Sequence, residues 1–176
     1  MDALKEQIYT IDDIYVLPEG QRAELIDGQI YYMAPPSRTH QRISWKLHQA
    51  IANYIDHQSG NCEVYAAPFA VFLNKDDINY LEPDISVICD ISKLDEKGCH
   101  GAPDWVVEIV SSTSRSRDYL LKLIKYRSAG VNEYWIVDPE TKIITVYAFK
   151  QNIVDQYCFG KDVPVGIFKD FSIRVE

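Results

Sequence analysis

The sequence predicts a single α/β domain over residues 1–176. Two long segments have the periodicity of amphipathic helices, and β-branched and aromatic residues concentrate in the runs around them. Hydrophobic residues make up 47% of the chain, and 12 Tyr, 6 Phe and 3 Trp provide material for a core. The sequence shows neither an internal repeat nor a linker. We therefore expect one domain, with its core at about 10–149 and further strands at 150–176.

The charge balance is that of an acidic globular chain. It has 18 Lys+Arg and 26 Asp+Glu, a formal net charge of −8. The aromatic content excludes intrinsic disorder, and only 8 Gly and 8 Pro exclude a collagen-like chain. Negative charge disfavours non-specific binding to nucleic acid, which depends on Lys and Arg clusters. Gathered carboxylates can nevertheless hold divalent cations that carry positive charge toward a phosphate. Net charge alone therefore does not exclude a nucleic-acid enzyme.

The first expected elements are a short helix and a hairpin. Residues 10–18 favour a helix with Thr10 as its N-cap and Pro18 at its end. Asp27-Gly28 stands between two apolar-rich runs, which is the strongest short signal for a β-hairpin. Residues 22–33 are therefore expected to form two antiparallel strands.

A long helix is predicted from Ser37 to about Gln58. At 100° per residue, one of its faces is an apolar stripe. His40 projects onto this stripe near the helix start, where a histidine is more often packed and hydrogen-bonded than functional. Trp45 projects onto the polar side, where an aromatic ring usually needs a partner. The stripe consists of Ile43, Leu47, Ala50, Ile51, Tyr54 and Ile55.

The rest of the chain is expected to combine buried strands with one more helix. That helix begins at Ser114 or Ser116 and ends at Gly130. The nearly continuous apolar character of 83–89 predicts a central strand. Strands are expected at 62–73, 83–89, 102–111, 132–137 and 143–149, and Pro68 interrupts the first of them. The helix is expected at 114–129, and a charged surface loop is expected at 93–100.

The cysteines predict neither a metal site nor a redox pair. Cys62, Cys89, Cys99 and Cys158 do not have the spacing of zinc ligands, so we expect four free thiols. The segment MDALKEQIYT lacks the basic and apolar regions of a secretory signal, and no apolar run is long enough to span a membrane. These observations predict a cytoplasmic protein without a membrane partner.

Two carboxylates stand in apolar strands. Asp84 opens the run PDISVIC, and Glu108 lies inside WVVEIV. Carboxylates are rarely buried unless they are paired or bind a metal. If the two strands are neighbours, both acids converge on one cation, and oxygen ligands suit Mg²⁺ or Mn²⁺. The alternative is that Asp84 is solvated at a strand end and Glu108 pairs with a Lys or Arg.

The second helix adds a charged stripe. Asp118 and Lys122 project to the same side, and leucine and isoleucine side chains spread around the rest. A helix that is apolar over so wide an arc is packed on more than one side. Lys122 either forms a simple pair with Asp118, which contributes about 0.2–0.5 kcal/mol, or reaches the two strand carboxylates. In the second case it could orient a water or neutralise charge on a phosphorane.

Other catalytic motifs do not occur. The sequence contains no G-x-S-x-G, G-x-x-x-x-G-K-[ST], G-x-G-x-x-G or H-E-x-x-H, and its four histidines do not have a zinc-ligand spacing. Acyl transfer, nucleotide hydrolysis, dinucleotide redox chemistry and zinc proteolysis are therefore disfavoured.

A set of short motifs in a fixed order carries a family resemblance. The motifs are ELIDG at 24–28, MAPPS at 33–37 followed by His40, PDISV at 83–87, VEIVS at 107–111, Asp118, Lys122 and Tyr126, and GVNEYWIVDP at 130–139. Together they resemble the Uma2 family, formerly the domain of unknown function DUF820. Its members are regarded as endonucleases of the PD-(D/E)XK, or restriction-endonuclease-like, superfamily. The resemblance covers about residues 10–149.

The resemblance implies a restriction-endonuclease-like core with a central mixed β-sheet flanked by helices. It implies that Asp84 and Glu108 are the catalytic acids and that, with the backbone carbonyl of Ile109, they hold one Mg²⁺ or Mn²⁺. Val110 stands where the superfamily has its lysine. The resemblance implies that Lys122, on the following helix, is the catalytic lysine instead.

Two further residues are implied near this site. Glu24 matches the upstream acid of the family and is expected to be a third metal ligand, directly or through water. Its alternative role is that of a hairpin residue paired with Arg22 or with a lysine. His40 is expected either to face the site or to be a packed side chain.

The implied function is metal-dependent hydrolysis of phosphodiester bonds in nucleic acid, with DNA as the expected substrate. The alternative is a catalytically silent nuclease-fold module for binding or assembly, which Val110 and the acidic composition favour. A homodimer is expected, because Trp45, the apolar helix at 115–129 and the Tyr134-Trp135 strand offer more apolar surface than one small domain covers.

Overall fold

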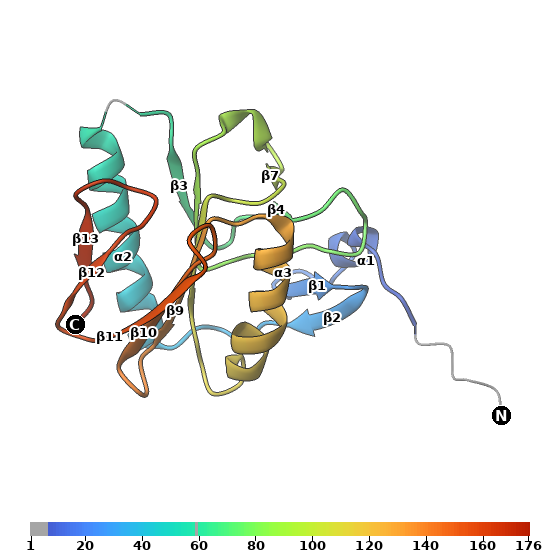
Figure 1. The fold of residues 1–176 in the computed structure, drawn as a ribbon. Coiled ribbons are helices and arrows are strands. Elements are labelled where there is room, and N and C mark those ends of the chain that lie inside the picture. Colours follow the sequence, from blue (N-terminus) through green and yellow to red (C-terminus); the bar gives the residue numbers. More distant parts are fainter. Residues whose placement is uncertain (1–6, 59) are drawn as a thin grey trace.

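The computed structural model describes residues 7–58 and 60–176. A six-stranded mixed sheet forms its centre, in the order β11-β10-β9-β8-β5-β3 (Figure 1). β8 and β9 are parallel, and the other pairs are antiparallel. The strands are β3 (Glu63–Ala66), β5 (Ile85–Ile88), β8 (Trp105–Ile109), β9 (Glu133–Asp138), β10 (Ile143–Ala148) and β11 (Ile153–Cys158). The predicted α/β class with a central mixed sheet is confirmed.

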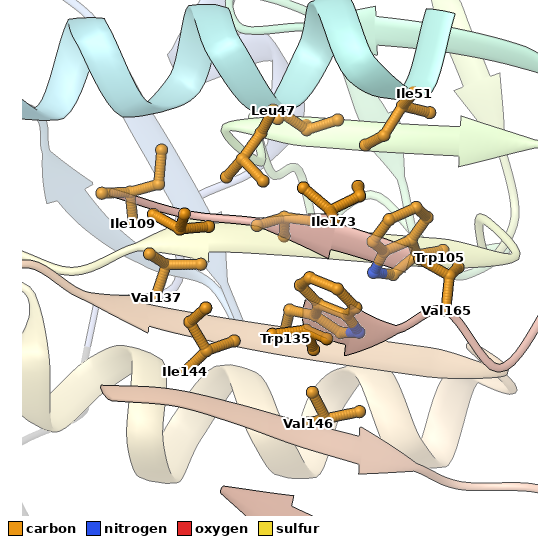
Figure 2. Close-up of a cluster of buried hydrophobic side chains, with 14 of the residues drawn as sticks. Leu47, Ile51, Trp105, Ile109, Trp135, Val137, Ile144, Val146, Val165 and Ile173 are labelled. Carbon is orange, nitrogen blue, oxygen red and sulfur yellow. The ribbon is translucent and has the colours of Figure 1, made fainter. Parts of the chain in front are cut away.

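Helices cover both faces of this sheet (Figure 1). α2 (Arg38–His57) packs the predicted stripe on one face, where Leu47 and Ile51 lie in the same core as Trp105 and Trp135 (Figure 2). The crossover from β8 to β9 contains the π-helical segment η2 (Arg117–Lys122) and α3 (Leu123–Ala129), which pack on the other face. None of the described helices has the length and apolar character needed to cross a membrane.

Strand alternation explains why the sheet has two cores. Along β8 and β9, alternate side chains point to opposite faces. Val107, Ile109, Trp135 and Val137 lie in the core beneath α2, and Val106, Val110, Tyr134 and Ile136 lie in the core beneath α3. Both strands are buried along their whole length, as is typical of central strands.

The N-terminal segment forms the predicted helix and hairpin. α1 (Ile11–Tyr15) begins with a capping box between Thr10 and Asp13. β1 (Ala23–Ile26) pairs with β2 (Gln29–Tyr32) through a tight turn in which Asp27 and Gly28 both have positive φ. This left-handed conformation is the one that an Asp-Gly turn requires.

Smaller sheets complete the fold. β4 (Val71–Phe72), β6 (Leu94–Asp95) and β7 (Gly98–His100) form a three-stranded sheet, preceded by the 3₁₀ turn η1 (Ile91–Lys93). The predicted loop at 93–100 is therefore wrong: its tight turn lets β6 and β7 pair. At the C-terminus, β12 (Asp162–Pro164) pairs with β13 (Ser172–Arg174).

The prediction of four free thiols is wrong for one pair. Cys62 directly precedes β3, and Cys89 directly follows β5. In this antiparallel pair Glu63 stands opposite Ile88, so continuing the register by one residue places Cys62 opposite Cys89. The two cysteines form a disulfide, whereas Cys99 and Cys158 are free.

Candidate active site

The two strand carboxylates are cross-strand neighbours. β5 and β8 pair antiparallel, with Ile85 opposite Val107 and Ser86 opposite Val106. Continuing this register by one residue places Asp84 opposite Glu108. The condition on which the sequence argument depended, that the two strands are neighbours, is therefore met. Side chains at directly opposed positions in a sheet lie close enough to interact.

Glu108 is buried in a network of donors from the crossover helix. One of its oxygens, Oε1, accepts hydrogen bonds from Lys122 Nζ at 2.8 Å and Tyr126 Oη at 2.7 Å. Burial, reinforced by nearby carboxylates and opposed by the charge of Lys122, raises the pKa of Glu108 to about 8. The lysine and the tyrosine, one helical turn apart, thus fix one oxygen of this acid.

Lys122 lies at the centre of three carboxylates. Its Nζ is 2.8 Å from Oε1 of Glu24, 2.8 Å from Oε1 of Glu108 and 3.5 Å from Oδ1 of Asp118. Burial alone would lower the pKa of Lys122, but the three carboxylates raise it above its ordinary range. Lys122 therefore remains charged, and both of its predicted contacts occur: the pair with Asp118 and the contact with Glu108. Within the part of the chain that the structure describes, Lys122 forms no ion pair with Asp84.

Asp84 has a separate set of donors. Its Oδ2 accepts a hydrogen bond from the backbone N–H of Ile109 at 2.7 Å and lies 3.0 Å from Nε2 of His40. Burial lowers the pKa of His40, but the hydrogen bond and charge of Asp84 outweigh burial and raise it. Ser37 caps α2 by accepting from the backbone N–H of His40. The start of α2 therefore positions His40 against Asp84.

Glu24 is fully buried on β1 and carries an unsatisfied oxygen. Its Oε1 also accepts from the backbone N–H of Glu82 at 3.2 Å. Within the described residues no donor bonds to its Oε2, and Arg117 Nε is 3.9 Å away. Oδ1 of Asp118 is a second buried oxygen to which no described residue donates. Since buried acceptors are usually satisfied, these two oxygens mark a place where a donor or cation would be stabilised.

The acids of the cluster, with Lys122, Arg117 and His40, line one cavity of about 820 Å³. Asp84, Glu108, Lys122, Glu24 and His40, the five predicted side chains, are brought together there. Across residues 7–58 and 60–176, however, no three His, Cys, Asp or Glu side chains gather closely enough to hold a metal ion.

Two members of the cluster, Tyr126 and Arg117, were assigned no role from the sequence. Tyr126 lies four residues after Lys122, a spacing that places both on one helix face and could have identified it as a partner. Arg117 is held over the ring of Tyr31, with its guanidinium carbon 5.2 Å from the ring centroid. No sequence signal connects Arg117 with Tyr31, because these two residues lie far apart in the chain.

Comparisons with known proteins agree with this architecture. A family model described as "Uma2: Putative restriction endonuclease" matches residues 7–175. The "Uncharacterized protein slr1290" of Synechocystis sp. (strain ATCC 27184 / PCC 6803 / Kazusa) is 29% identical over 130 residues, which cover 73% of this chain and 67% of that protein. A crystal structure of "a putative nuclease belonging to DUF820" from Anabaena variabilis ATCC 29413 matches with a TM-score of 0.72 at 23% identity, covering 90% of this chain and 89% of that one.

The structural match at this identity concerns the fold. The family match covers nearly the whole of the chain and agrees with the motifs between Glu24 and Pro139. The chain belongs to the Uma2 family of restriction-endonuclease-like proteins.

Proposed function

We propose that this protein is a PD-(D/E)XK-type nuclease that uses Mg²⁺ or Mn²⁺ to hydrolyse phosphodiester bonds in nucleic acid, with DNA as the expected substrate. The observation that carries the proposal is the carboxylate cluster in the cavity. Four acids line it, Glu24, Asp84, Glu108 and Asp118, and among the described residues Lys122 and Arg117 are the lysine and arginine side chains that approach them within 4.0 Å. Such an excess of buried negative charge favours binding of a cation.

The donor set has the chemistry that these metals prefer. Asp84, Glu108 and the backbone carbonyl of Ile109 would hold the ion, with Glu24 as a further ligand directly or through water. All of these ligands are oxygen atoms, as suits Mg²⁺ and Mn²⁺. The unsatisfied Oε2 of Glu24 supports this assignment. A bound ion would lower the pKa of a water and polarise the scissile phosphate.

The side chains of the chain itself have defined roles in this proposal. Lys122 is held in its charged form by the surrounding carboxylates. In this proposal its ammonium orients a water or stabilises negative charge on a phosphorane. Tyr126 and Lys122 both donate to Oε1 of Glu108 and thereby fix the orientation of this acid. His40 and the Ile109 amide do the same for Asp84.

Calorimetric titration with Mn²⁺ tests the proposal without a guess about the substrate. The wild type should bind the ion saturably, and the Asp84→Asn/Glu108→Gln double variant should not. Glu140→Gln is the matched control, because Glu140 is an exposed carboxylate that lines the same cavity and bonds Arg115. Equal binding by the wild type and the double variant would place the metal elsewhere and refute the assignment.

Glu108→Gln alone then tests catalysis. The variant should retain the circular dichroism spectrum and lose cleavage of DNA, because the amide carries no charge for a cation. Unchanged cleavage by this variant would contradict the assigned role of Glu108.

A second candidate function is a catalytically silent nuclease-fold module. The specific observation in its favour is that Lys122 bonds both Glu24 and Glu108 at 2.8 Å and so neutralises part of the cluster without a metal. Val110 also occupies the usual position of the superfamily lysine. Absence of Mn²⁺ binding by the wild type at millimolar concentration, together with no cleavage, would favour this module over the nuclease.

A further inference from the structure

Two exposed aromatic side chains line the same cavity as the carboxylates. Trp45 on α2 has 61% of its surface exposed, and Tyr32 at the end of β2 has 59% exposed. Neither belongs to a core: the buried stripe of α2 is formed by Ile43, Leu47 and Ile51. Large exposed aromatic rings that line a cavity together with charged side chains are typical of a ligand-binding surface.

The spacing along α2 relates Trp45 to the acids. Gln41, Trp45 and His48 follow one another at four and three residues, so they form one row on the helix, and all three line the cavity. His40, which contacts Asp84, lies five residues before Trp45, or about 7.5 Å along the helix axis at 1.5 Å per residue. Trp45 therefore lines the same cavity as the acids, at a position further along α2.

Arginine side chains supply positive charge along the same path. Arg22 lines the cavity and is held by Glu82, with its Nε 2.8 Å from Oε2. Arg117 also lines the cavity, stacked on Tyr31. Aromatic rings combined with fixed arginines are the combination that binds unpaired nucleic acid, because bases stack on the rings and the arginines contact the phosphates.

We propose that Trp45 and Tyr32 stack on unpaired bases, so the substrate is single-stranded nucleic acid, or a strand that is unpaired where it enters the cavity. A base inside a duplex has both of its faces covered by neighbouring base pairs, so the rings have no access to it. This inference rests on the proposed nuclease function and specifies the substrate class of the same site.

The chain offers a built-in optical probe. Trp105 and Trp135 are fully buried at 0% exposure, so Trp45 is the tryptophan that a stacked base would quench. We would titrate wild-type protein in EDTA, which prevents metal-dependent cleavage, with a single strand of about 12 nucleotides, a length within the range of known single-strand sites. The same strand annealed into a blunt duplex is the comparison. Intrinsic fluorescence and the anisotropy of a labelled strand are the readouts.

The expected result is quenching and tighter binding by the single strand than by the duplex. Trp45→Ala and Tyr32→Ala should each weaken binding of the single strand by about tenfold, and Trp45→Phe by no more than about threefold, because phenylalanine retains a ring that stacks. Val154→Ala is the control, since Val154 is 58% exposed on β11 and does not line the cavity. It should leave binding unchanged.

The outcomes separate this inference from the proposed function. Equal binding of duplex and single strand, or unchanged binding by both alanine variants, would overturn the inference, and metal-dependent cleavage by the wild type would still support the nuclease. Quenching and selective binding without any cleavage would support the inference and count against turnover. A change in molar mass of Trp45→Ala by light scattering would assign the ring to a subunit interface and overturn the stacking role.

Discussion

Glu133 shows how one buried side chain can join distant parts of the fold. It begins β9, and its carboxylate accepts hydrogen bonds from Nε1 of Trp135 at 2.5 Å and from the backbone N–H of Ile167 at 2.9 Å. The C-terminal segment passes so close that a Cβ added to Gly166 would lie 2.8 Å from Oε2 of Glu133. Glu133 therefore connects the central sheet to the C-terminal segment, which explains a buried carboxylate at the start of β9.

The protonation of Glu133 predicts a pH dependence of stability. Burial raises its pKa above the ordinary 4.5, against the hydrogen bonds that lower it. At a pH between the pKa of Glu133 in the unfolded state and its pKa in the folded state, the native state binds more protons than the unfolded state. The contribution of Glu133 is thus fully present below pH 4.5 and declines as pH rises through the folded pKa. Urea unfolding of the wild type and Glu133→Gln should show the wild-type advantage shrinking as pH rises from about 4 to about 8.

In the difference between the wild type and Glu133→Gln, the pH-dependent contributions of the other carboxylates to the free energy of unfolding cancel, because both proteins contain them. The glutamine cannot accept from both partners of Glu133, so the variant should also be less stable by about 1–3 kcal/mol at the lowest pH. A free-energy difference that stays constant or grows with pH would show that the pKa of Glu133 is not raised.

Residues of the site differ in how far the sequence could predict them. Asp84 and Glu108 were predictable because an acid in an apolar strand needs a partner. The catalytic role of Lys122 was implied by the family resemblance. Its position on the helix alone left two roles open, a pair with Asp118 or a contact with the strand carboxylates. The donors of Asp84 were not predictable, since the Ile109 amide and His40 meet it only through strand pairing and helix placement.

At the scale of elements, β3 and β5 are joined both by hydrogen bonds and by the Cys62–Cys89 disulfide. The bond closes a loop with a sequence separation of 27 residues. In the chain-entropy model, a loop of this length stabilises the fold by about 3–4 kcal/mol. Cys62→Ser/Cys89→Ser should therefore lower the free energy of unfolding in urea by about that amount.

Reduced wild-type protein provides the matched measurement for the disulfide. Reductant should bring the wild type to the stability of the double serine variant and should leave that variant unaffected. If reductant changes neither protein, and thiol labelling finds four reactive cysteines in the denatured wild type, the disulfide does not form in solution.

A helix, turn or strand was predictable where the residue pattern that indicates it lies within one short segment. The stripe of α2, the Asp-Gly turn and the two apolar central strands each follow from nearby residues. Pairing between distant segments was not predictable, so the β3–β5 register and its disulfide were missed. The short strands β6 and β7 were also missed, because their charged sequence resembles a loop and Gly98 permits the turn with a φ of 146°.

For the whole molecule, one of the surfaces expected to form a homodimer interface is buried inside the chain. Tyr134 and Trp135 are fully buried within one chain, so the β9 strand offers no surface to a partner. The wide apolar arc of the second helix is only partly packed, because Leu120 and Ile124 are each 65% exposed. Four residues apart, they lie next to each other on the outer side of the helix. They leave an apolar patch that does not line the cavity.

This patch supports the last prediction, a homodimer in solution. Light scattering of the wild type should give about twice the 20.2 kDa chain mass, because pairing two such patches removes apolar surface from water. Leu120→Glu/Ile124→Glu should give a 20.2 kDa species, since the introduced charges cannot be buried at a symmetric interface. Val154→Glu, at an exposed position on β11, should remain dimeric. A wild type that is monomeric at every concentration would exclude the homodimer, and a dimeric double glutamate variant would place its interface elsewhere.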